Sequence, residues 1–309
     1  MCAEKKYTFA EINSLATKKC EEFISRSEAD YGKRLDRAAE MVMQNGNRRL
    51  IMLAGPSSSG KTTGARLLAE RFRKRGGRAY IVSLDNFYFD DKSKYPRDEY
   101  GQIDFETVYA LDIPLIHDCF SMLLKKGLCE IPVYNFHTGK RESETEKLLL
   151  RDNDVVIVEG LHALNPVITD VLPPDSLFKI YTSVSSRVYD DNGDVFMTKR
   201  DLRLVRRIVR DFRFRSSPVE DTLEMWPSVM RGEDKYLFPF SDLSDIKINS
   251  FHPCEPCVLA TLSKDLLDTV EKSSPFYEPA YSITMRMRRF AELDPSLLSR
   301  NSLLREFTG

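Results

Sequence analysis

A glycine-bounded loop that directly follows an apolar run constrains this chain more than any other feature. Residues 55–62 read GPSSSGKT, and the five residues before them, 50–54, read LIMLA. In such a loop the backbone N–H groups point inward at phosphate oxygens, while Lys61 adds a positive charge and Thr62 a hydroxyl for Mg²⁺. The alternative is a Ser- and Gly-rich turn without a ligand. We predict a site for Mg²⁺ and ATP whose contacts are Gly55, Ser57, Ser58, Ser59, Gly60, Lys61, Thr62 and Thr63.

The bulk composition argues against several classes of partner. The 309 residues carry 46 Lys and Arg against 47 Asp and Glu, a formal net charge of -1, so no global positive field favours nucleic acid. No apolar run has the length of a signal peptide or a membrane span. We therefore expect a cytoplasmic protein that binds a small molecule rather than nucleic acid or a membrane, and a homo-oligomer stays open.

The six cysteines are sparse for a chain of this length, which is typical of reduced thiols. Only Cys254 and Cys257 have a spacing that suggests a metal or redox site, and the second ligand pair such a site needs is missing nearby. We expect this pair to be structural.

Apolar runs alternate with helical patterns along the chain. Strands are predicted at 78–84, 155–158, 177–181 and 245–248, in addition to the run before the loop, and a helix is predicted over 28–45. This alternation predicts a P-loop NTPase fold of the α/β class, a doubly wound parallel sheet with a helical lid and helical N- and C-terminal extensions. The expected division is an N-terminal helical extension, 1–48, and a phosphate-loop domain, 49–309, with a lid at about 190–240 and a helical tail.

Two carboxylates close predicted strands at the edge where ligands bind in open α/β sheets. Asp85 follows the strand 78–84, and Glu159 ends the apolar run 155–158. Phosphoryl transfer needs a carboxylate to accept the acceptor's proton and oxygen ligands for a metal. We predict Asp85 as catalytic base or metal ligand and Glu159, with Thr62, as a metal ligand; the alternatives are a helix-capping aspartate and a plain strand end.

Residues 199–215 predict an arginine-edged helix. Apolar Leu202, Val205, Val209 and Phe212 recur at helical spacing, and the adjoining face carries Arg203, Arg206, Arg210 and Arg213. Seven of the eight cations in this stretch are Arg, whose planar guanidinium suits phosphate. The alternatives are a solvated face and RNA contact.

An aromatic segment follows a predicted extended stretch. Tyr134, Phe136 and His137 could stack on and read a nucleobase, and the alternative is packing at the edge of a sheet. Trp226 is predicted to be a packing anchor.

From about Arg49 onward, the chain resembles the uridine kinase and phosphoribulokinase family of P-loop kinases, and within it the bacterial uridine kinase-like nucleoside kinases. The shared stretches are 55–63, 84–88, 104–106, 134–136 with 138–141, 158–166, 203–211, 225–229, 238–240 and 302–307.

This resemblance implies transfer of the γ-phosphate of ATP to the 5′-hydroxyl of a uridine- or cytidine-like nucleoside. Asp85 would be the base, Lys61, Arg203 and Arg206 would assist catalysis, and Arg207 and Arg210 would join the nucleotide contacts. The acceptor would contact Tyr88, Phe105, Glu106, Tyr134, Phe136, His137 and Arg203.

The chain also departs from the pattern of uridine kinases. Glu106 stands where they carry an aspartate that grips ribose hydroxyls, and Gly139 where they place a base-reading histidine, with His137 two residues earlier. A sugar phosphate acceptor and a regulatory ATPase therefore stay open.

Overall fold

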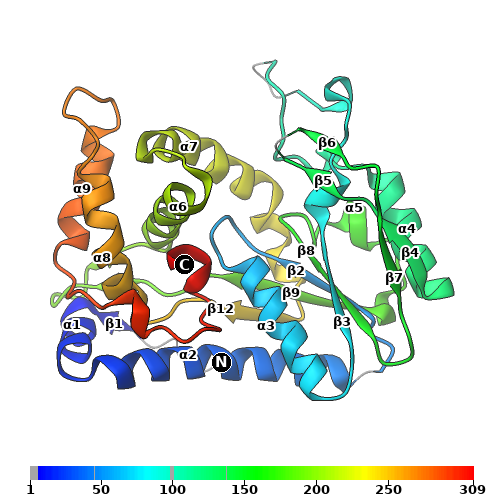
Figure 1. Ribbon diagram of the computed structural model, residues 1–309, viewed down its shortest axis with the longest axis horizontal. Coiled ribbons are helices and arrows are strands. Elements are labelled where there is room, and N and C mark those ends of the chain that lie inside the picture. The colour runs from blue at the N-terminus through cyan, green and yellow to red at the C-terminus, as the bar shows by residue number, and fades with distance from the viewer. Residues whose placement is uncertain (1–5, 45, 98–100, 137) are drawn as a thin grey trace.

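Five parallel strands form the central sheet of the protein, in the computed structural model that describes residues 6–44, 46–97, 101–136 and 138–309 (Figure 1). Their order is β12-β9-β2-β8-β3, so the strand before the phosphate loop is central. The strands are β2 (Leu50–Ala54), β3 (Ala79–Ser83), β8 (Val155–Glu159), β9 (Leu177–Ser183) and β12 (Ile246–Asn249). All five residues of β2 are buried, because parallel sheets are covered on both faces. The predicted parallel, doubly wound sheet is confirmed.

Alternate residues of β2 face two different cores. Ile51 and Leu53 pack with α3 (Lys61–Lys74), α2 (Cys20–Met43) and α8 (Glu255–Leu267). Leu50, Met52 and Ala54 pack with α4 (Ile113–Lys126) and α5 (Pro166–Thr169) on the opposite face. This two-residue period places one helical layer on each side of the sheet, and the phosphate loop emerges at its carboxyl edge.

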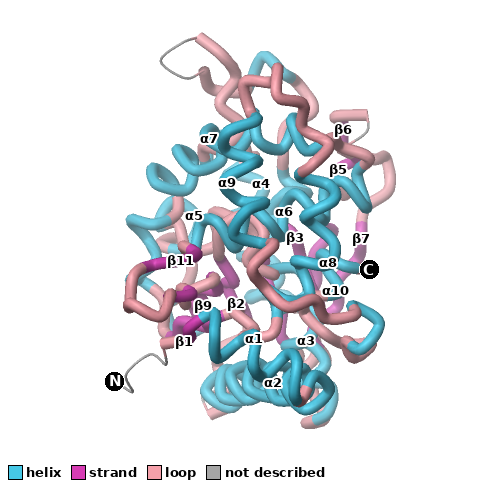
Figure 2. The backbone as a smooth tube through the Cα atoms, turned by 90° about the vertical axis from the view of Figure 1, so that its left-hand side faces the viewer, coloured by secondary structure: helices cyan, strands magenta, loops and turns pink. Residues whose placement is uncertain are grey.

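The N-terminal helices share the core of the sheet. Helix α2 begins at Cys20, so the predicted start at residue 28 was wrong; Phe23 and Ile24 are buried and extend the apolar stripe by two turns. In Figure 2, α2 is seen nearly end-on at the base of the molecule. Before it lie β1 (Tyr7–Thr8) and α1 (Phe9–Lys18), and β1 pairs with β10 (Val188–Tyr189), which pairs in turn with β11 (Val195–Met197).

Two long helices, α6 (Lys199–Arg215) and α7 (Val219–Tyr236), cross above the carboxyl edge of the sheet (Figure 1). Near them lie α9 (Tyr277–Met287) and α10 (Arg305–Thr308), and the far side carries the hairpins β4 (Leu128–Ile131)–β7 (Glu146–Leu149) and β5 (Tyr134–Asn135)–β6 (Lys140–Arg141). The 3₁₀ turns are η1 (Leu84–Phe87), η2 (Lys92–Lys94), η3 (Val108–Ala110), η4 (Pro174–Ser176), η5 (Phe238–Leu243) and η6 (Pro295–Leu297). Within the described ranges no helix is long and apolar enough to span a bilayer.

Helix α6 has the predicted bounds but a different surface. Leu202, Val205 and Val209 are buried as predicted, whereas Phe212 is exposed, so its place in the apolar stripe was wrong. Residues 202–209 are all buried where the helix packs against α7, α8 and α10, whereas its last turn, 212–215, is exposed.

Candidate phosphate-transfer site

The phosphate loop is packed so tightly that its two glycines are required. A Cβ atom on Gly55 would lie 2.1 Å from the carbonyl oxygen of Thr182, and one on Gly60 would lie 2.6 Å from Cδ1 of Leu303. Gly60 also has a φ of +83°, in the left-handed region that side chains disfavour. The loop therefore starts α3 in a conformation that leaves the first N–H groups of the helix pointing out of its N-terminus.

Ser57, in the middle of the loop, is held at three atoms by the two helices above it. Its N–H donates to Glu233 Oε1 at 2.7 Å, and its carbonyl accepts from Arg203 Nη1 at 3.1 Å. Its hydroxyl accepts from Arg207 Nη1 at 2.9 Å. These contacts fix the loop from outside.

Two buried ion pairs support these contacts with Ser57. Arg203 and Glu233 form a two-pronged pair with both N–O distances at 2.7 Å, and Arg203 also stacks over Trp226, which is buried as predicted. Arg206, completely buried, pairs with Glu255 through Nε–Oε1 at 2.9 Å and Nη2–Oε2 at 2.5 Å. Such pairs cancel charges that would be costly to bury alone.

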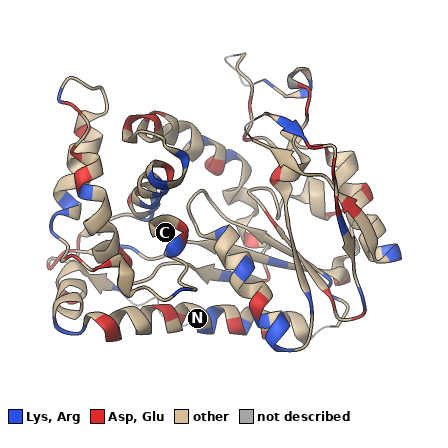
Figure 3. Ribbon diagram, in the orientation of Figure 1, with Lys and Arg blue, Asp and Glu red and all other residues tan. Residues whose placement is uncertain are grey.

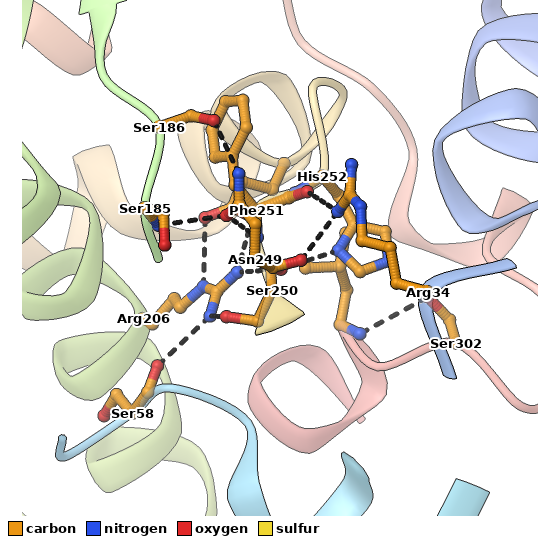
Figure 4. A network of polar contacts seen from close by, with 12 residues as sticks. Arg34, Ser58, Ser185, Ser186, Arg206, Asn249, Ser250, Phe251, His252 and Ser302 are labelled. Atoms are coloured by element: carbon orange, nitrogen blue, oxygen red, sulfur yellow. Dashed lines mark hydrogen bonds and ion pairs between the residues drawn. The ribbon is translucent and has the colours of Figure 1, made fainter. Parts of the chain in front are cut away.

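Arg206 also ties the loop to the strand at the end of the sheet. Its Nη1 donates to the carbonyl of Ser58 at 3.2 Å, and its Nη2 donates to the carbonyl of Ser250 at 3.0 Å (Figure 4). The guanidinium thus holds the phosphate loop from behind and makes its contacts with the backbone of the loop.

The next arginines of α6 gather around one acid, Asp211. Arg207 Nε lies 3.2 Å from Asp211 Oδ2, and Arg210 Nη2 lies 2.7 Å from Oδ1. Burial lowers the pKa of Arg207, and Asp211 opposes that shift. Figure 3 shows the cations along α6 beside the loop. Positive charge is therefore present beside the phosphate loop, and Asp211 balances part of it.

The three predicted metal ligands converge below the loop. The hydroxyl of Thr62 donates to Glu159 Oε1 at 3.3 Å. Burial raises the pKa of the Glu159 carboxyl, the charge of Lys61 opposes this, and Asp85 adds to it, so these groups lie within electrostatic reach of one another. Mg²⁺ is usually held by one or two carboxylates plus phosphate oxygens and water. These oxygen donors fit such an ion. Among the described residues, no group of three or more His, Cys, Asp and Glu side chains is arranged to hold a metal ion by itself.

Asp85 lies in η1, immediately beyond the end of β3. Its N–H donates to the hydroxyl of Ser83 at 3.3 Å, which fixes the turn. The bulk of protein around Asp85 partly desolvates its carboxyl and raises its pKa, although the residue is exposed at the surface, and Lys61 opposes the shift. Lys61 itself donates to the carbonyl of Pro56 at 3.0 Å. A carboxylate with a raised pKa beside a phosphate loop can accept a proton from a hydroxyl.

Aromatic rings surround the space next to Asp85. The Tyr88 ring lies 5.6 Å from that of Tyr134, and the Tyr134 ring lies 5.1 Å from that of Phe136. The side chains of Phe105 and Phe136 are 49% and 66% exposed. The structure therefore brings the predicted stacking residues together with faces open to solvent, while His137 lies outside the described residues.

Glu106 lies where α7 passes over this aromatic group. A Cβ atom on Gly232 of α7 would lie 2.8 Å from Cβ of Glu106, so the absence of a side chain at Gly232 leaves room for Glu106. Burial, and next the charge of Glu233, raises the pKa of Glu106 to about 7. Tyr236 donates to Asp104 Oδ2 at 2.6 Å, which ties the same stretch to α7. With a pKa near 7, the Glu106 carboxyl can either donate or accept a hydrogen bond.

A cavity of about 730 Å³ opens at the carboxyl ends of β9 and β12, beside Pro56 of the loop. Its lining includes five cations, Arg187, Lys199, Arg200, Arg203 and Lys247. Arg200 pairs with Asp234 and Lys247 with Asp242, so part of this charge is balanced within the chain. The cavity offers room for an anionic group on the side of the loop opposite Asp85.

Three acids that support the loop, directly or through an arginine, were missed from the sequence. Glu233 and Glu255 pair with the α6 arginines, and Glu306 Oε2 accepts the N–H of Thr63 at 3.1 Å. Glu255 lies between Cys254 and Cys257, two buried free thiols whose pKa values burial raises. The Cys-Glu-Pro-Cys stretch therefore places an acid beneath Arg206.

Comparison with known proteins agrees with this geometry. Residues 50–255 match the model of the phosphoribulokinase / uridine kinase family. The chain belongs to this family. Uridine kinase from Geobacillus sp. (strain WCH70) is 29% identical over 201 residues, which cover 64% of this chain and 84% of that protein. Uridine kinase from Bacillus pumilus (strain SAFR-032) is 28% identical over 200 residues, covering 64% and 85%.

Among solved structures, phosphoribulokinase from Rhodobacter spheroides aligns with a TM-score of 0.43 and 15% identity, over 68% of this chain and 74% of that one. The family match and the uridine kinase relatives make this chain a phosphotransferase that acts on a hydroxyl group.

Proposed function

We propose that this protein transfers the γ-phosphate of ATP to the 5′-hydroxyl of a nucleoside of the uridine or cytidine type, in the cytoplasm. The observation that carries the proposal is the convergence of Lys61, Glu159 and Asp85 beside the loop, next to an aromatic group with open faces. Phosphoryl transfer needs little more than a phosphate cradle, a metal and a base, since most of its catalysis is positioning and electrostatic stabilisation.

The roles follow from the contacts. The loop amides and Lys61 hold the triphosphate, and Thr62 and Glu159 would hold Mg²⁺, which neutralises charge on the phosphate oxygens when bound. Asp85 accepts the proton of the attacking hydroxyl, whose oxygen forms a bond to the γ-phosphorus while the bond to ADP breaks.

The arginines act mainly through the loop. Arg206 is completely buried and donates to the carbonyl of Ser58, so we assign it a positioning role. Arg203 and Arg207 both contact Ser57 and would face the phosphates of a bound nucleotide, while Arg210 pairs with Asp211.

The acceptor would lie between Asp85 and the aromatic rings. Tyr88, Tyr134 and Phe136 offer faces for a base, and Phe105 borders the same group through Tyr95. Glu106 would accept hydrogen bonds from ribose hydroxyls.

The test is a coupled ADP-release assay of the purified protein with ATP and Mg²⁺ against nucleosides, deoxynucleosides and sugar phosphates. Strong stimulation by uridine or cytidine is the expected result. Stimulation by a sugar phosphate alone would instead support the phosphoribulokinase-like alternative. Rapid ADP release that no acceptor increases would contradict the kinase proposal and favour a regulatory ATPase.

A further inference from the structure

A segment near the end of the sequence lies directly on the phosphate loop. This α10 segment, defined here as residues 302–309, contains α10 and packs against α6 (Figure 1). It is separated from the loop by about 240 positions in sequence, and it lies against Gly60 and Thr63.

The polar contact is made by Glu306. Its Oε2 accepts the N–H of Thr63 at 3.1 Å, and Thr63 is the third residue of α3. The first N–H groups of a helix have no partner within the helix, and together with the helix dipole they form an anion-binding position. After a phosphate loop, that position is where phosphate of a bound nucleotide is expected. Here a carboxylate of the same chain occupies it.

Apolar contacts hold the segment in place. Leu303 lies against Gly60, so closely that a Cβ atom there would be 2.6 Å from Leu303 Cδ1. Phe307 is completely buried, with the guanidinium of Arg206 over its ring at 5.0 Å from the centroid. Glu306 by contrast is only half-buried. The segment is anchored at its apolar residues, while its acid can leave Thr63 without uncovering a core.

A carboxylate and a phosphate cannot share the one N–H of Thr63. Their negative charges also repel each other at hydrogen-bond distance. We propose that Glu306 sets the affinity for the phosphate donor: its carboxylate must leave Thr63 before a nucleotide phosphate can bind that amide. The inference rests on the proposed function in one respect, that ATP is the ligand of the loop.

Glu306→Gln is the sharpest variant, because the amide keeps the size of the side chain and an oxygen acceptor but removes the charge. Isothermal titration with Mg²⁺ and the non-hydrolysable analogue AMP-PNP should give a Kd roughly tenfold lower than that of the wild type. Leu303→Ala, which loosens the segment from Gly60, should lower the Kd in the same direction. Glu292→Gln, an exposed acid paired with Lys264, is the matched control and should leave the Kd unchanged.

Hydrogen exchange gives a second readout. If Glu306 had only a structural role, nucleotide binding would not change the exchange rates around it. In the wild type, AMP-PNP should speed exchange of the backbone amides next to Glu306, since this turn loses its contact with Thr63 while the apolar anchors stay in place. Slower exchange there would mean that the segment closes over the nucleotide, and this would overturn the inference.

The outcomes separate the inference from the function on which it rests. Equal or weaker binding of AMP-PNP by Glu306→Gln, with binding by the wild type intact, overturns the inference and leaves the proposed kinase standing. Absence of binding in the wild type and in all three variants overturns both.

Discussion

The two sides of the site are built in opposite ways. On the donor side, the phosphate loop is fixed by buried ion pairs from α6, α7 and α8, and Ser57 alone is held at three atoms. On the acceptor side, Asp85 lies in a 3₁₀ turn, and the aromatic group is carried by short strands and loops with exposed rings.

This difference corresponds to what each side must bind. A triphosphate has the same shape in every turnover, and a rigid cradle of N–H groups costs no reorganisation during the reaction. An acceptor varies from one family member to another, and loops on a rigid scaffold are where such variation is tolerated. The donor side should therefore respond to mutation through stability, and the acceptor side through kinetics.

The largest expected effect is on the donor side. Glu255→Ala leaves Arg206 charged and unpaired in a site without solvent, so the free energy of unfolding should fall by about 3–5 kcal/mol. Urea denaturation followed by circular dichroism measures it. Glu292→Ala, which removes an exposed acid, should change the value by less than about 1 kcal/mol. A loss for Glu255→Ala as small as that of the control would show that the buried pair does not hold the loop.

Asp85→Asn tests the acceptor side. Turnover should drop by a factor of about a hundred or more, because the amide cannot accept the hydroxyl proton. The affinity for ATP should stay nearly unchanged, since the phosphate cradle is intact. Steady-state kinetics with the best acceptor, beside titration of AMP-PNP, give both numbers. Asp242→Asn, a change in an exposed acid, is the control. Unchanged turnover in Asp85→Asn would show that Asp85 is not the base.

Phe136→Ala tests the aromatic group with a smaller effect. Loss of an aromatic contact of about 0.5–1.5 kcal/mol corresponds to a two- to tenfold higher KM for the acceptor. The kcat value and the KM for ATP should not change, because the side chain is far more exposed than buried. Phe212→Ala removes another exposed ring, from α6, and should leave all three constants unchanged. A fall in kcat without a change in KM would contradict a binding role.

A further effect, spread over several pH units, is a pH dependence of stability at Glu106. Because the pKa of this acid rises from 4.5 to about 7 on folding, the folded state holds the proton more tightly than the unfolded chain does. The stability that this provides is present below the unfolded pKa and is lost as pH rises through about 7. Asp85 and Glu159 have raised pKa values as well and add to the trend in the wild type.

The variant Glu106→Gln isolates this contribution. Between about pH 5 and about pH 8, the Tm of the variant should rise relative to that of the wild type, since the amide does not ionise. Differential scanning calorimetry across this range is the measurement. A Tm difference that does not change with pH would show that Glu106 is not held in a protonation-sensitive environment.

The sequence was sufficient where the relevant physics is local. The apolar run 50–54, the two glycines and the acids at strand ends are neighbours of the elements they define, and the sheet and the loop followed from them. The helix before the sheet was predicted to start too late because Cys20, Glu21 and Glu22 weaken the pattern before Phe23.

The partners of the loop could not be found in this way. Glu233 lies 176 positions from Ser57, and Glu306 lies 243 positions from Thr63, so no local spacing connects them. The arginine pattern of α6 predicted charge near phosphate, and the structure places Arg203 and Arg207 against the phosphate loop. It could not show that Arg203 and Arg206 would be buried against acids, because that depends on where α7 and α8 pack.

The central claim is that Asp85 faces the hydroxyl to be phosphorylated while the loop holds the triphosphate. A crystal structure of the protein with Mg²⁺, AMP-PNP and uridine tests this most directly. The account predicts β- and γ-phosphate oxygens on the loop amides and Lys61, with the 5′-hydroxyl between Asp85 and the γ-phosphate. A structure in which Asp85 points away from the triphosphate, with no space for an alcohol between them, would contradict it.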